Sequence, residues 1–333
     1  IFIGPNGAGK SSVLQALELL KQSRGSPNLR PGRFQFSEYS QLVNSGGTSK
    51  TIGIGFGGEA KQASEGFGDT AFTYHATFGS SGFIVKNHGL MHTENYAWPD
   101  LPSQINISGQ YLYGDTEIDP STIGGEKFGV NIGVGNVICF PFIALGVVHQ
   151  GKDYKKDCDK LYQSITQLFN LFSDSLGRVF IVGAIRGFHQ LSYPLGDNAV
   201  ESPDEANEIV TTFAYRRGLE AKVAEWLNEI TNVKISFHLV PNKMASLLSA
   251  DGYNIYHEGF GTGQLVKPLV QMAIAPPDSL IAIEEAEIHL HPAAQIRLCD
   301  TLAEIAQTEN KQILLTTHSD HILTGFLNIV ADG

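Results

Sequence analysis

The most specific chemical pattern in this chain is a glycine-rich run that ends in a lysine and a serine. Residues 4–11 read G-P-N-G-A-G-K-S, directly after the apolar run Ile1–Ile3 and before a helical pattern that begins near Val13. Glycines let consecutive backbone N–H groups converge on one phosphate, and the start of the following helix adds its positive dipole end. The run therefore predicts a phosphate-binding loop between a strand and a helix.

Two side chains of this loop carry specific chemistry. Lys10 would neutralise the charge of the terminal phosphates and is a predicted catalytic residue, while the hydroxyl of Ser11 would ligate Mg²⁺. The residues that we expect to contact a nucleotide are Gly4, Asn6, Gly7, Ala8, Gly9, Lys10, Ser11 and Ser12.

A second pattern is an apolar strand that ends in two acids. Residues 279–283 read S-L-I-A-I and are followed by Glu284 and Glu285. A buried parallel strand would deliver both carboxylates to the carboxyl edge of a sheet, where α/β proteins bind ligands. One carboxylate can hold Mg²⁺ and the other can orient and deprotonate an attacking water. An acidic strand end in solvent is the simpler alternative, and the intact phosphate loop favours the catalytic interpretation.

Two further patterns are weaker alone. The apolar run that ends at Thr317 is followed by His318, which could donate to a phosphate or to water, although a lone histidine at a strand end is commonly an ordinary surface residue. The run Glu258–Leu265 (E-G-F-G-T-G-Q-L) precedes a predicted helix through Met272. It could form a second anion cradle at a helix start, and an ordinary glycine turn is the alternative.

Taken in order, these patterns resemble the ATP-binding-cassette class of P-loop ATPases. The run Ile283–Pro292 (I-E-E-A-E-I-H-L-H-P), the run Thr316–Ser319 and the helix Leu14–Gln22 narrow the resemblance to the overcoming-lysogenization-defect/RecF/SMC-like branch. The motifs lie at both ends of the chain, and the middle resembles the branch only in layout. The implied fold is an α/β P-loop NTPase, an ABC-type ATPase head, with a large mixed β/α insertion.

The resemblance also implies roles for individual residues. Glu284 takes the Mg²⁺-binding Walker B position, Glu285 the general base and His318 the switch histidine, and His289 and His291 lie near a dimer seam. The signature that completes the site of a second subunit consists of Gly261, Thr262, Gly263 and Gln264. The chain departs from the usual pattern in having Glu284 in place of Asp, Ala286 in place of Pro, and Gly-Thr-Gly-Gln in place of Ser-Gly-Gly-Gln.

The composition limits the classes of partner. The 333 residues include 23 Lys and Arg against 34 Asp and Glu, which gives a formal net charge of −11. A protein devoted to nonspecific DNA contact usually carries a basic excess, so we expect any nucleic-acid contact to be indirect or local.

Three scattered cysteines (Cys139, Cys158 and Cys299) suit a reducing compartment. The longest strongly apolar run, Val137–Val148, is shorter than the ~20 residues that span a bilayer. Without a signal-peptide pattern either, we expect a cytoplasmic protein that does not cross a membrane.

The predicted organisation is one ATPase core split by an insertion. Residues 1–24 form the phosphate-loop half, 25–234 the β-rich and helical insertion, and 235–333 the half with the signature, Walker B and histidine strands. Predicted strands and helices are Thr51–Phe56, Phe72–Phe78, Ile105–Tyr113, Val179–Ile185, Leu280–Ile283 and Gln312–Leu315 (strands), and Asp159–Phe172, a helix from Ser202–Glu205 to Asn228, and Ala293–Gln307 (helices). Arg186 follows a buried strand, where a salt bridge is a simpler interpretation than contact with phosphate or DNA.

The function that these patterns predict is Mg²⁺-dependent ATP hydrolysis by a subunit that dimerises around ATP. The resemblance extends this to gating of an effector, a nuclease in the first instance, in DNA repair or anti-phage defence. Two alternatives stay open: a non-hydrolysing ATP sensor that scaffolds a partner, and the cytoplasmic ATPase subunit of a transporter. The pair His289-x-His291 beside Glu287 has no further ligands at a recognisable spacing and does not predict a metal site.

Overall fold

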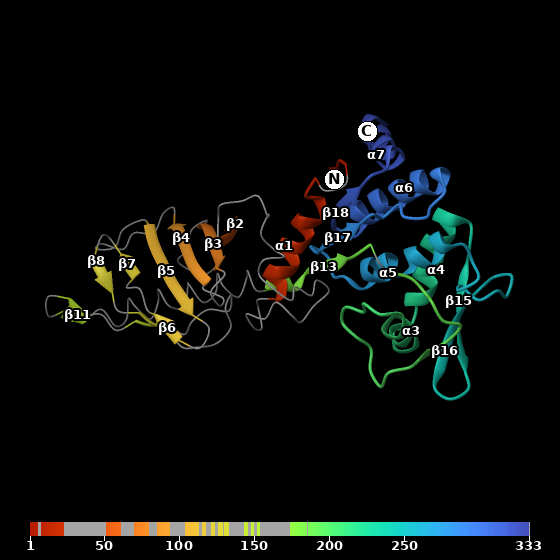
Figure 1. Cartoon of the computed structure of the whole chain (residues 1–333), viewed down its shortest axis with the longest axis horizontal. Helices are drawn as coiled ribbons and strands as arrows, with labels where there is room; N and C mark the ends of the chain where they lie inside the picture. The colour runs from red at the N-terminus through yellow and green to blue at the C-terminus, as the bar shows by residue number, and fades with distance from the viewer. Residues whose placement is uncertain are drawn as a thin grey trace. The chain divides into compact units, whose positions relative to one another are not determined.

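The computed structural model describes residues 1–5, 8–22, 174–184 and 186–332, together with the backbone of the strands between residues 51 and 153 (Figure 1). The chain forms two compact units. One contains Ile1–Gln15 and Arg178–Gly333, and the other contains Ala16–Gly177. Residues from both ends of the sequence therefore fold together in the first unit.

The first unit is built on a parallel sheet whose strands come from distant parts of the chain. Its order is β1 (Phe2–Ile3), β18 (Gln312–Thr317), β17 (Leu280–Glu284) and β13 (Val179–Val182). All three pairings are parallel. The central residues of β17 and all of β13 are buried. Continuous apolar runs are typical of buried parallel strands. The strands predicted at 280–283 and 312–315 are confirmed. The strand predicted at 179–185 is confirmed over Val179–Val182, where β13 ends, and residue 185 lies outside the described residues.

Helices pack against the inner strands of this sheet and contribute to the core. Helix α5 (Phe260–Ile274) contacts β13 and β17, α6 (Pro292–Thr308) contacts β18, and α4 (Leu219–Thr231) packs against α5 and α6. Helix α7 (Asp320–Asp332) packs against α6 (Figure 1). Among the fully buried side chains of the core are Val182, Leu227, Leu265, Leu269, Ile281, Ile283, Leu298 and Leu302. The predicted helix 293–307 is confirmed as α6.

The single helix predicted from residues 202–205 to Asn228 is wrong, because the structure has two. Helix α3 spans Ala206–Tyr215 and α4 begins at Leu219. The N-cap of α4 is Gly218, whose φ of 81° lies in the left-handed region that favours glycine. The chain turns there, and apolar residues on both sides of the turn made the helical pattern look continuous.

A small antiparallel sheet lies beside these helices. Its order is β14 (Tyr193–Pro194), β16 (Met244–Ser249) and β15 (Ile235–Val240). The hairpin between β15 and β16 turns at Asn242 and Lys243, which have φ values of 64° and 54°. Two consecutive residues with positive φ are typical of the tight turns whose twist matches a β-hairpin.

The second unit contains a larger antiparallel sheet. Its strand order is β2-β3-β4-β5-β7-β8, with β6 paired to β5, and β9 pairs with β10 and β11 with β12 in two small ladders. The bounds are β2 Thr51–Ala60, β3 Thr70–Gly79, β4 Val85–Thr93, β5 Gln104–Leu112, β6 Asp115–Glu117, β7 Ser121–Ile123, β8 Glu126–Phe128, β9 Val130–Ile132, β10 Ile143–Leu145, β11 Val148–His149 and β12 Lys152–Asp153. The predicted strands at 51–56, 72–78 and 105–113 are confirmed as β2, β3 and β5. The helix predicted at 159–172 lies outside the described residues.

The two units divide the chain differently from the predicted boundaries. The sequence predicts an insertion over residues 25–234, whereas residues 178–234 belong to the unit that holds the parallel sheet. The physical reason is that β13 pairs with β17 along its whole length, and α4 packs on α5. Within the described part of the chain, no helix is long and apolar enough to span a membrane.

Candidate functional site

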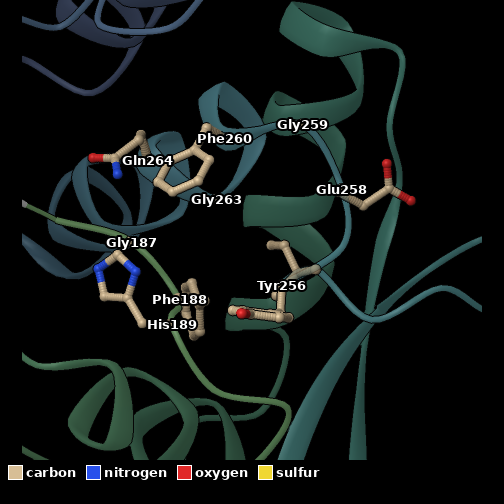
Figure 2. A pocket seen from close by; sticks show the side chains of 10 residues that line it. Gly187, Phe188, His189, Tyr256, Glu258, Gly259, Phe260, Gly263 and Gln264 are labelled. Atoms are coloured by element: carbon tan, nitrogen blue, oxygen red, sulfur yellow. The ribbon is translucent and has the colours of Figure 1, made fainter.

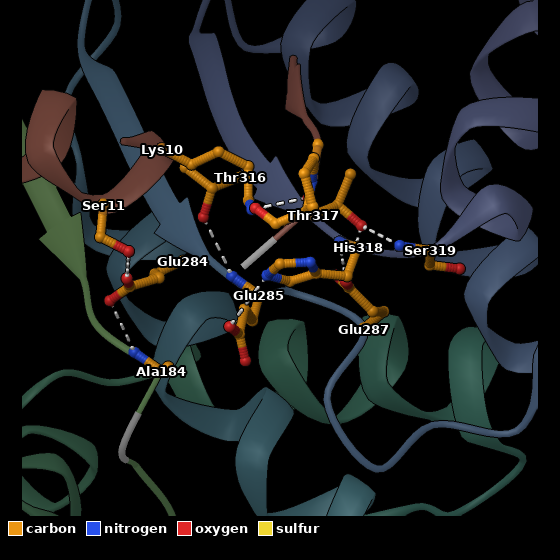
Figure 3. A network of polar contacts seen from close by, with 12 residues as sticks. Lys10, Ser11, Ala184, Glu284, Glu285, Glu287, Thr316, Thr317, His318 and Ser319 are labelled. Atoms are coloured by element: carbon orange, nitrogen blue, oxygen red, sulfur yellow. Dashed lines mark hydrogen bonds and ion pairs between the residues drawn. The ribbon is translucent and has the colours of Figure 1, made fainter. Parts of the chain in front are cut away.

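The parallel register brings the ends of three strands to one edge of the sheet. Ile3 lies opposite Thr317, and Glu284 lies opposite Thr316 on the other side of the same strand. Because parallel strands share their carboxyl edge, the loop after β1, the acids after β17 and the histidine after β18 meet there. Figure 3 shows these side chains gathered at that edge.

The phosphate loop leads directly into helix α1 (Lys10–Gln22). The ammonium of Lys10 donates to the carbonyl oxygens of Gly4 at 2.8 Å and Pro5 at 3.0 Å, so it lies over its own loop. Gly9 has a φ of 88°, where any side chain would be strained. Ala8 and Ser12 form backbone hydrogen bonds within the same turn. The predicted contacts Asn6 and Gly7 lie outside the described residues.

Two oxygen-bearing side chains that could ligate a divalent cation lie between the phosphate loop and the acidic strand. The hydroxyl of Ser11 donates a hydrogen bond to Oε1 of Glu284, and the backbone N–H of Ala184 donates to Oε2 of the same carboxylate at 3.4 Å (Figure 3). A hydroxyl and a carboxylate are the hard ligands that Mg²⁺ prefers beside phosphate oxygens. The two residues predicted as metal ligands are thus in contact, and their chemistry fits this ion.

Glu285 and His318 form a second pair at the same edge. Nε2 of His318 lies 3.6 Å from Oε1 of Glu285, and their side chains are 33% and 35% exposed. Glu285 has a φ of 47° and its N–H donates to the carbonyl of Thr316 at 2.9 Å. A non-glycine residue in the left-handed region at a strand end is a recurring feature of functional sites. Here it turns the Glu285 side chain out of the strand direction, where water can reach it.

Glu287 was missed as a site residue by the sequence analysis. Its Oε1 accepts a hydrogen bond from the hydroxyl of Thr317 at 2.6 Å and another from the backbone N–H of His318 at 2.8 Å. The signal available in the sequence was a third acid two positions after the Glu284–Glu285 pair, on the turn that leaves the strand.

Arg186 is also part of the site's framework. Its side chain is buried, and its guanidinium donates to the carbonyls of Gly183 at 2.8 Å, Glu284 at 2.7 Å, Glu285 at 2.9 Å and Gln264 at 2.9 Å. Arginine offers five N–H donors in a planar fork, which suits it to such a set of acceptors. These bonds join the end of β13, the end of β17 and the first turn of α5.

The predicted signature forms the first turn of α5 and contacts other parts of the chain. A Cβ on Gly261 would lie 2.5 Å from the carbonyl oxygen of His289, so only glycine allows this approach. The four residues Gly261, Thr262, Gly263 and Gln264 are all buried. In front of them lies a small pocket, around which Figure 2 shows the side chains of Phe260, Tyr256 and His189.

The two other histidines have local roles. His289 has a φ of 61°, and its ring lies 5.5 Å from that of Phe260, edge to face. His291 is the N-cap of α6, and its Nδ1 accepts from the N–H of Ala293 at 3.2 Å. In the described part of the chain, no group of three or more His, Cys, Asp or Glu side chains is arranged to hold a metal ion.

Two protein-family models match this chain, one near each end. Residues 196–323 match a family model described as an AAA ATPase domain, and residues 1–86 match one described as "AAA domain, putative AbiEii toxin, Type IV TA system". Both matched models describe AAA domains, which supports an ABC-like P-loop ATPase. The parallel sheet with its phosphate loop, acidic strand and histidine strand agrees with this assignment and with the predicted α/β fold class.

Several solved structures are similar to this chain at low identity. A structure titled as an SmcHead bound to the C-winged helix domain of ScpA is 12% identical over 97% of this chain and 83% of that chain, with a TM-score of 0.47. The SMC head domain from Thermotoga maritima is 13% identical over 97% and 81%, with a TM-score of 0.33. An Smc head from Pyrococcus furiosus, bound to the C-terminal domain of ScpA, is 11% identical over 97% and 84%, with a TM-score of 0.39. Among curated protein sequences no match is found.

Proposed function

We propose that the chain binds ATP with Mg²⁺ and hydrolyses it at the carboxyl edge of the parallel sheet. One observation carries this proposal: three groups of residues meet at the carboxyl edge of the parallel sheet. They are Lys10 on its phosphate loop, Ser11 in contact with Glu284, and Glu285 beside His318. Phosphoryl transfer needs little covalent chemistry from a protein. It requires positioning of the phosphate, neutralisation of its charge and an oriented water.

Each group would perform one of these tasks. The loop's N–H groups and Lys10 bind the phosphates and stabilise negative charge. Ser11 and Glu284 would hold Mg²⁺, which when bound neutralises charge on the terminal phosphates. Glu285 accepts the proton of the attacking water, and the neighbouring imidazole of His318 orients that water or donates to the phosphate. Because both side chains are partly exposed, water reaches them without a rearrangement of the core.

Removing the loop's positive charge tests the binding half of this proposal. Lys10→Ala should weaken ATP binding by about 10- to 100-fold, because a hydrogen bond to a charged group contributes about 1.5–3 kcal/mol. Calorimetric titration with Mg·ATP measures the change. The exposed Lys234 provides a matched control, since Lys234→Ala removes the same charge far from the site along the chain. Equal affinity of Lys10→Ala and the native protein would show that the loop does not bind the nucleotide.

We also propose that a second copy of the chain completes the site. The first turn of α5 begins at the N-cap Gly259, which provides no side-chain hydrogen bond to the helix, and Phe260 beside it is 66% exposed. A helix start of this kind has backbone N–H groups that can bind a phosphate. The signature residues Gly261–Gln264 would thus contact the nucleotide held by the partner's loop.

Light scattering on Glu285→Gln tests this dimer. This variant should bind Mg·ATP without consuming it, so its mass should double when Mg·ATP is added and return to that of a monomer when the nucleotide is removed. The same protein with Mg·ADP is the control. A mass that stays constant would contradict ATP-driven dimerisation while leaving nucleotide binding intact. It would favour the second candidate, an ATP sensor that scaffolds a partner. The altered signature, with Gly261 and Thr262 in place of Ser-Gly, also points to this candidate.

We propose that the biological role of the chain is to control an effector protein, a nuclease, in anti-phage defence or DNA repair. The sequence resemblance to the overcoming-lysogenization-defect/RecF/SMC-like branch supports it. The family model over residues 1–86 is named for a putative toxin of a toxin–antitoxin system, which agrees with a defence role. A net charge of −11 favours contact with DNA through the effector. Co-expression with neighbouring genes, followed by purification through this chain with and without Mg·ATP, tests the partner.

A further inference from the structure

Glu287 makes two hydrogen bonds that converge on one oxygen. It lies on the turn between β17 and α6, three residues after Glu284. Oε1 accepts from the hydroxyl of Thr317 at 2.6 Å and from the backbone N–H of His318 at 2.8 Å (Figure 3). Thr317 is fully buried, so its hydroxyl has a fixed place and direction. The carboxylate thus links the turn after the acidic strand to the end of the histidine strand.

Hydrogen bonds of Glu287 and Thr317 fix the backbone position of residues 317–319. The hydroxyl of Thr317 donates to Glu287 and accepts from the N–H of Ser319 at 3.0 Å. His318 lies between these two bonds, and its own N–H is held by the same carboxylate oxygen. Its ring is one-third exposed and lies 3.6 Å from the Glu285 carboxylate. The direction of the imidazole therefore depends on the hydrogen bonds that fix the backbone of residues 317–319.

We propose that Glu287 is a positioning residue that holds His318 in place beside Glu285. It acts through the backbone of residues 317–318 and does not itself contact the reacting atoms. The proposal rests on the proposed hydrolysis of ATP at this site. Groups that orient site residues through hydrogen bonds typically change activity by about 10- to 100-fold when they are removed.

The role requires an acceptor oxygen, and a glutamine supplies one. Both hydrogen bonds use Oε1, whereas Oε2 is buried and has no hydrogen-bond partner among the described residues. An amide at position 287 keeps one carbonyl oxygen of the same reach and geometry. Glu287→Gln should therefore preserve the position of His318, while Glu287→Ala should lose it.

Two measurements on the full chain test the proposal. In steady-state hydrolysis, Glu287→Ala should lower kcat by about 10- to 100-fold with little change in KM, and Glu287→Gln should stay within a few-fold of the native kcat. Thr317→Val, which removes one of the two donors, should give a smaller decrease. In hydrogen exchange followed by mass spectrometry, the amide of His318 should exchange faster in Glu287→Ala than in the native chain and in Glu287→Gln. Glu304→Ala, an exposed acid on α6, is the control.

The outcomes separate this proposal from the function on which it rests. Native kcat in Glu287→Ala, or a Glu287→Gln variant as slow as Glu287→Ala, would overturn it. An unchanged exchange rate at His318 in Glu287→Ala would overturn it as well, whatever the kinetics. If the native chain hydrolyses no ATP, the proposed function fails, and the exchange measurement still decides whether Glu287 holds His318. If Glu287→Ala does not fold, the comparison of Thr317→Val with Glu287→Gln supplies both readouts.

Discussion

Replacing Glu285 with glutamine is expected to lower kcat for ATP hydrolysis by about 10²- to 10⁴-fold, the range that a general base contributes. The amide cannot accept the proton of the attacking water, whereas its size and its 3.6 Å approach to His318 are retained. Lys10 and its loop are untouched, so ATP affinity should change little. Phosphate release at saturating Mg·ATP measures kcat, and calorimetric titration measures affinity.

A matched variant separates loss of the base from loss of negative charge. Glu304 is an exposed glutamate of α6, and Glu304→Gln should hydrolyse ATP at the native rate. A native rate in Glu285→Gln would mean that another group accepts the proton. A parallel fall in affinity and kcat would instead indicate that Glu285 binds the nucleotide complex.

Replacing Arg186 with methionine is expected to lower the free energy of unfolding by about 3 kcal/mol or more. The guanidinium is 4% exposed and donates to four carbonyl oxygens at 2.7–2.9 Å. Methionine fills a similar volume without any donor, and each buried acceptor that is left unpaired costs about 1–3 kcal/mol. The carbonyl of Glu285 keeps the N–H of Ile288 at 3.1 Å as a partner, so the loss comes mainly from the other three. Two of the four acceptors are the carbonyls of Glu284 and Glu285, so hydrolysis should fall as well.

Urea unfolding measures this effect as a lower midpoint with an unchanged slope. Arg217→Met is the control, because Arg217 is exposed on the turn between α3 and α4 and its loss should leave the midpoint where it is. Arg186→Lys should lower the midpoint by an intermediate amount. A compact ammonium cannot reach all the acceptors that the planar guanidinium contacts. An unchanged midpoint in Arg186→Met would mean that these carbonyls find other donors.

The sequence by itself determined the parts of this protein whose signal is contiguous. The run Gly4–Ser11 combines glycines, a lysine and a hydroxyl in one turn between a strand and a helix, so local chemistry alone predicts what it binds. The strands β17 and β18 could be predicted because a fully buried parallel strand is a short apolar run with polar residues at its end. Their order along the chain was enough to indicate the ATPase fold.

Local patterns were insufficient where one residue interrupts a pattern or a strand pairs at long range. Gly218 divides the predicted helix into α3 and α4, because its left-handed backbone outweighs the helical apolar spacing on both sides. The placement of residues 178–234 with the ATPase sheet depends on the pairing of β13 with β17, which are about 100 residues apart. Nothing in the sequence near Val179 indicates that partner.

Only the tertiary structure decided how the site is held together. For Arg186 the sequence favoured a salt bridge over contact with phosphate or DNA. Its hydrogen bonds to four carbonyl oxygens depend on where β13 and β17 end and where α5 begins. Glu287 reaches Thr317 and His318 because the register of β17 and β18 places the turn after one strand beside the end of the other. Hydrogen bonds between distant segments depend on relative positions in space, and residue types at a spacing along the chain do not contain that information.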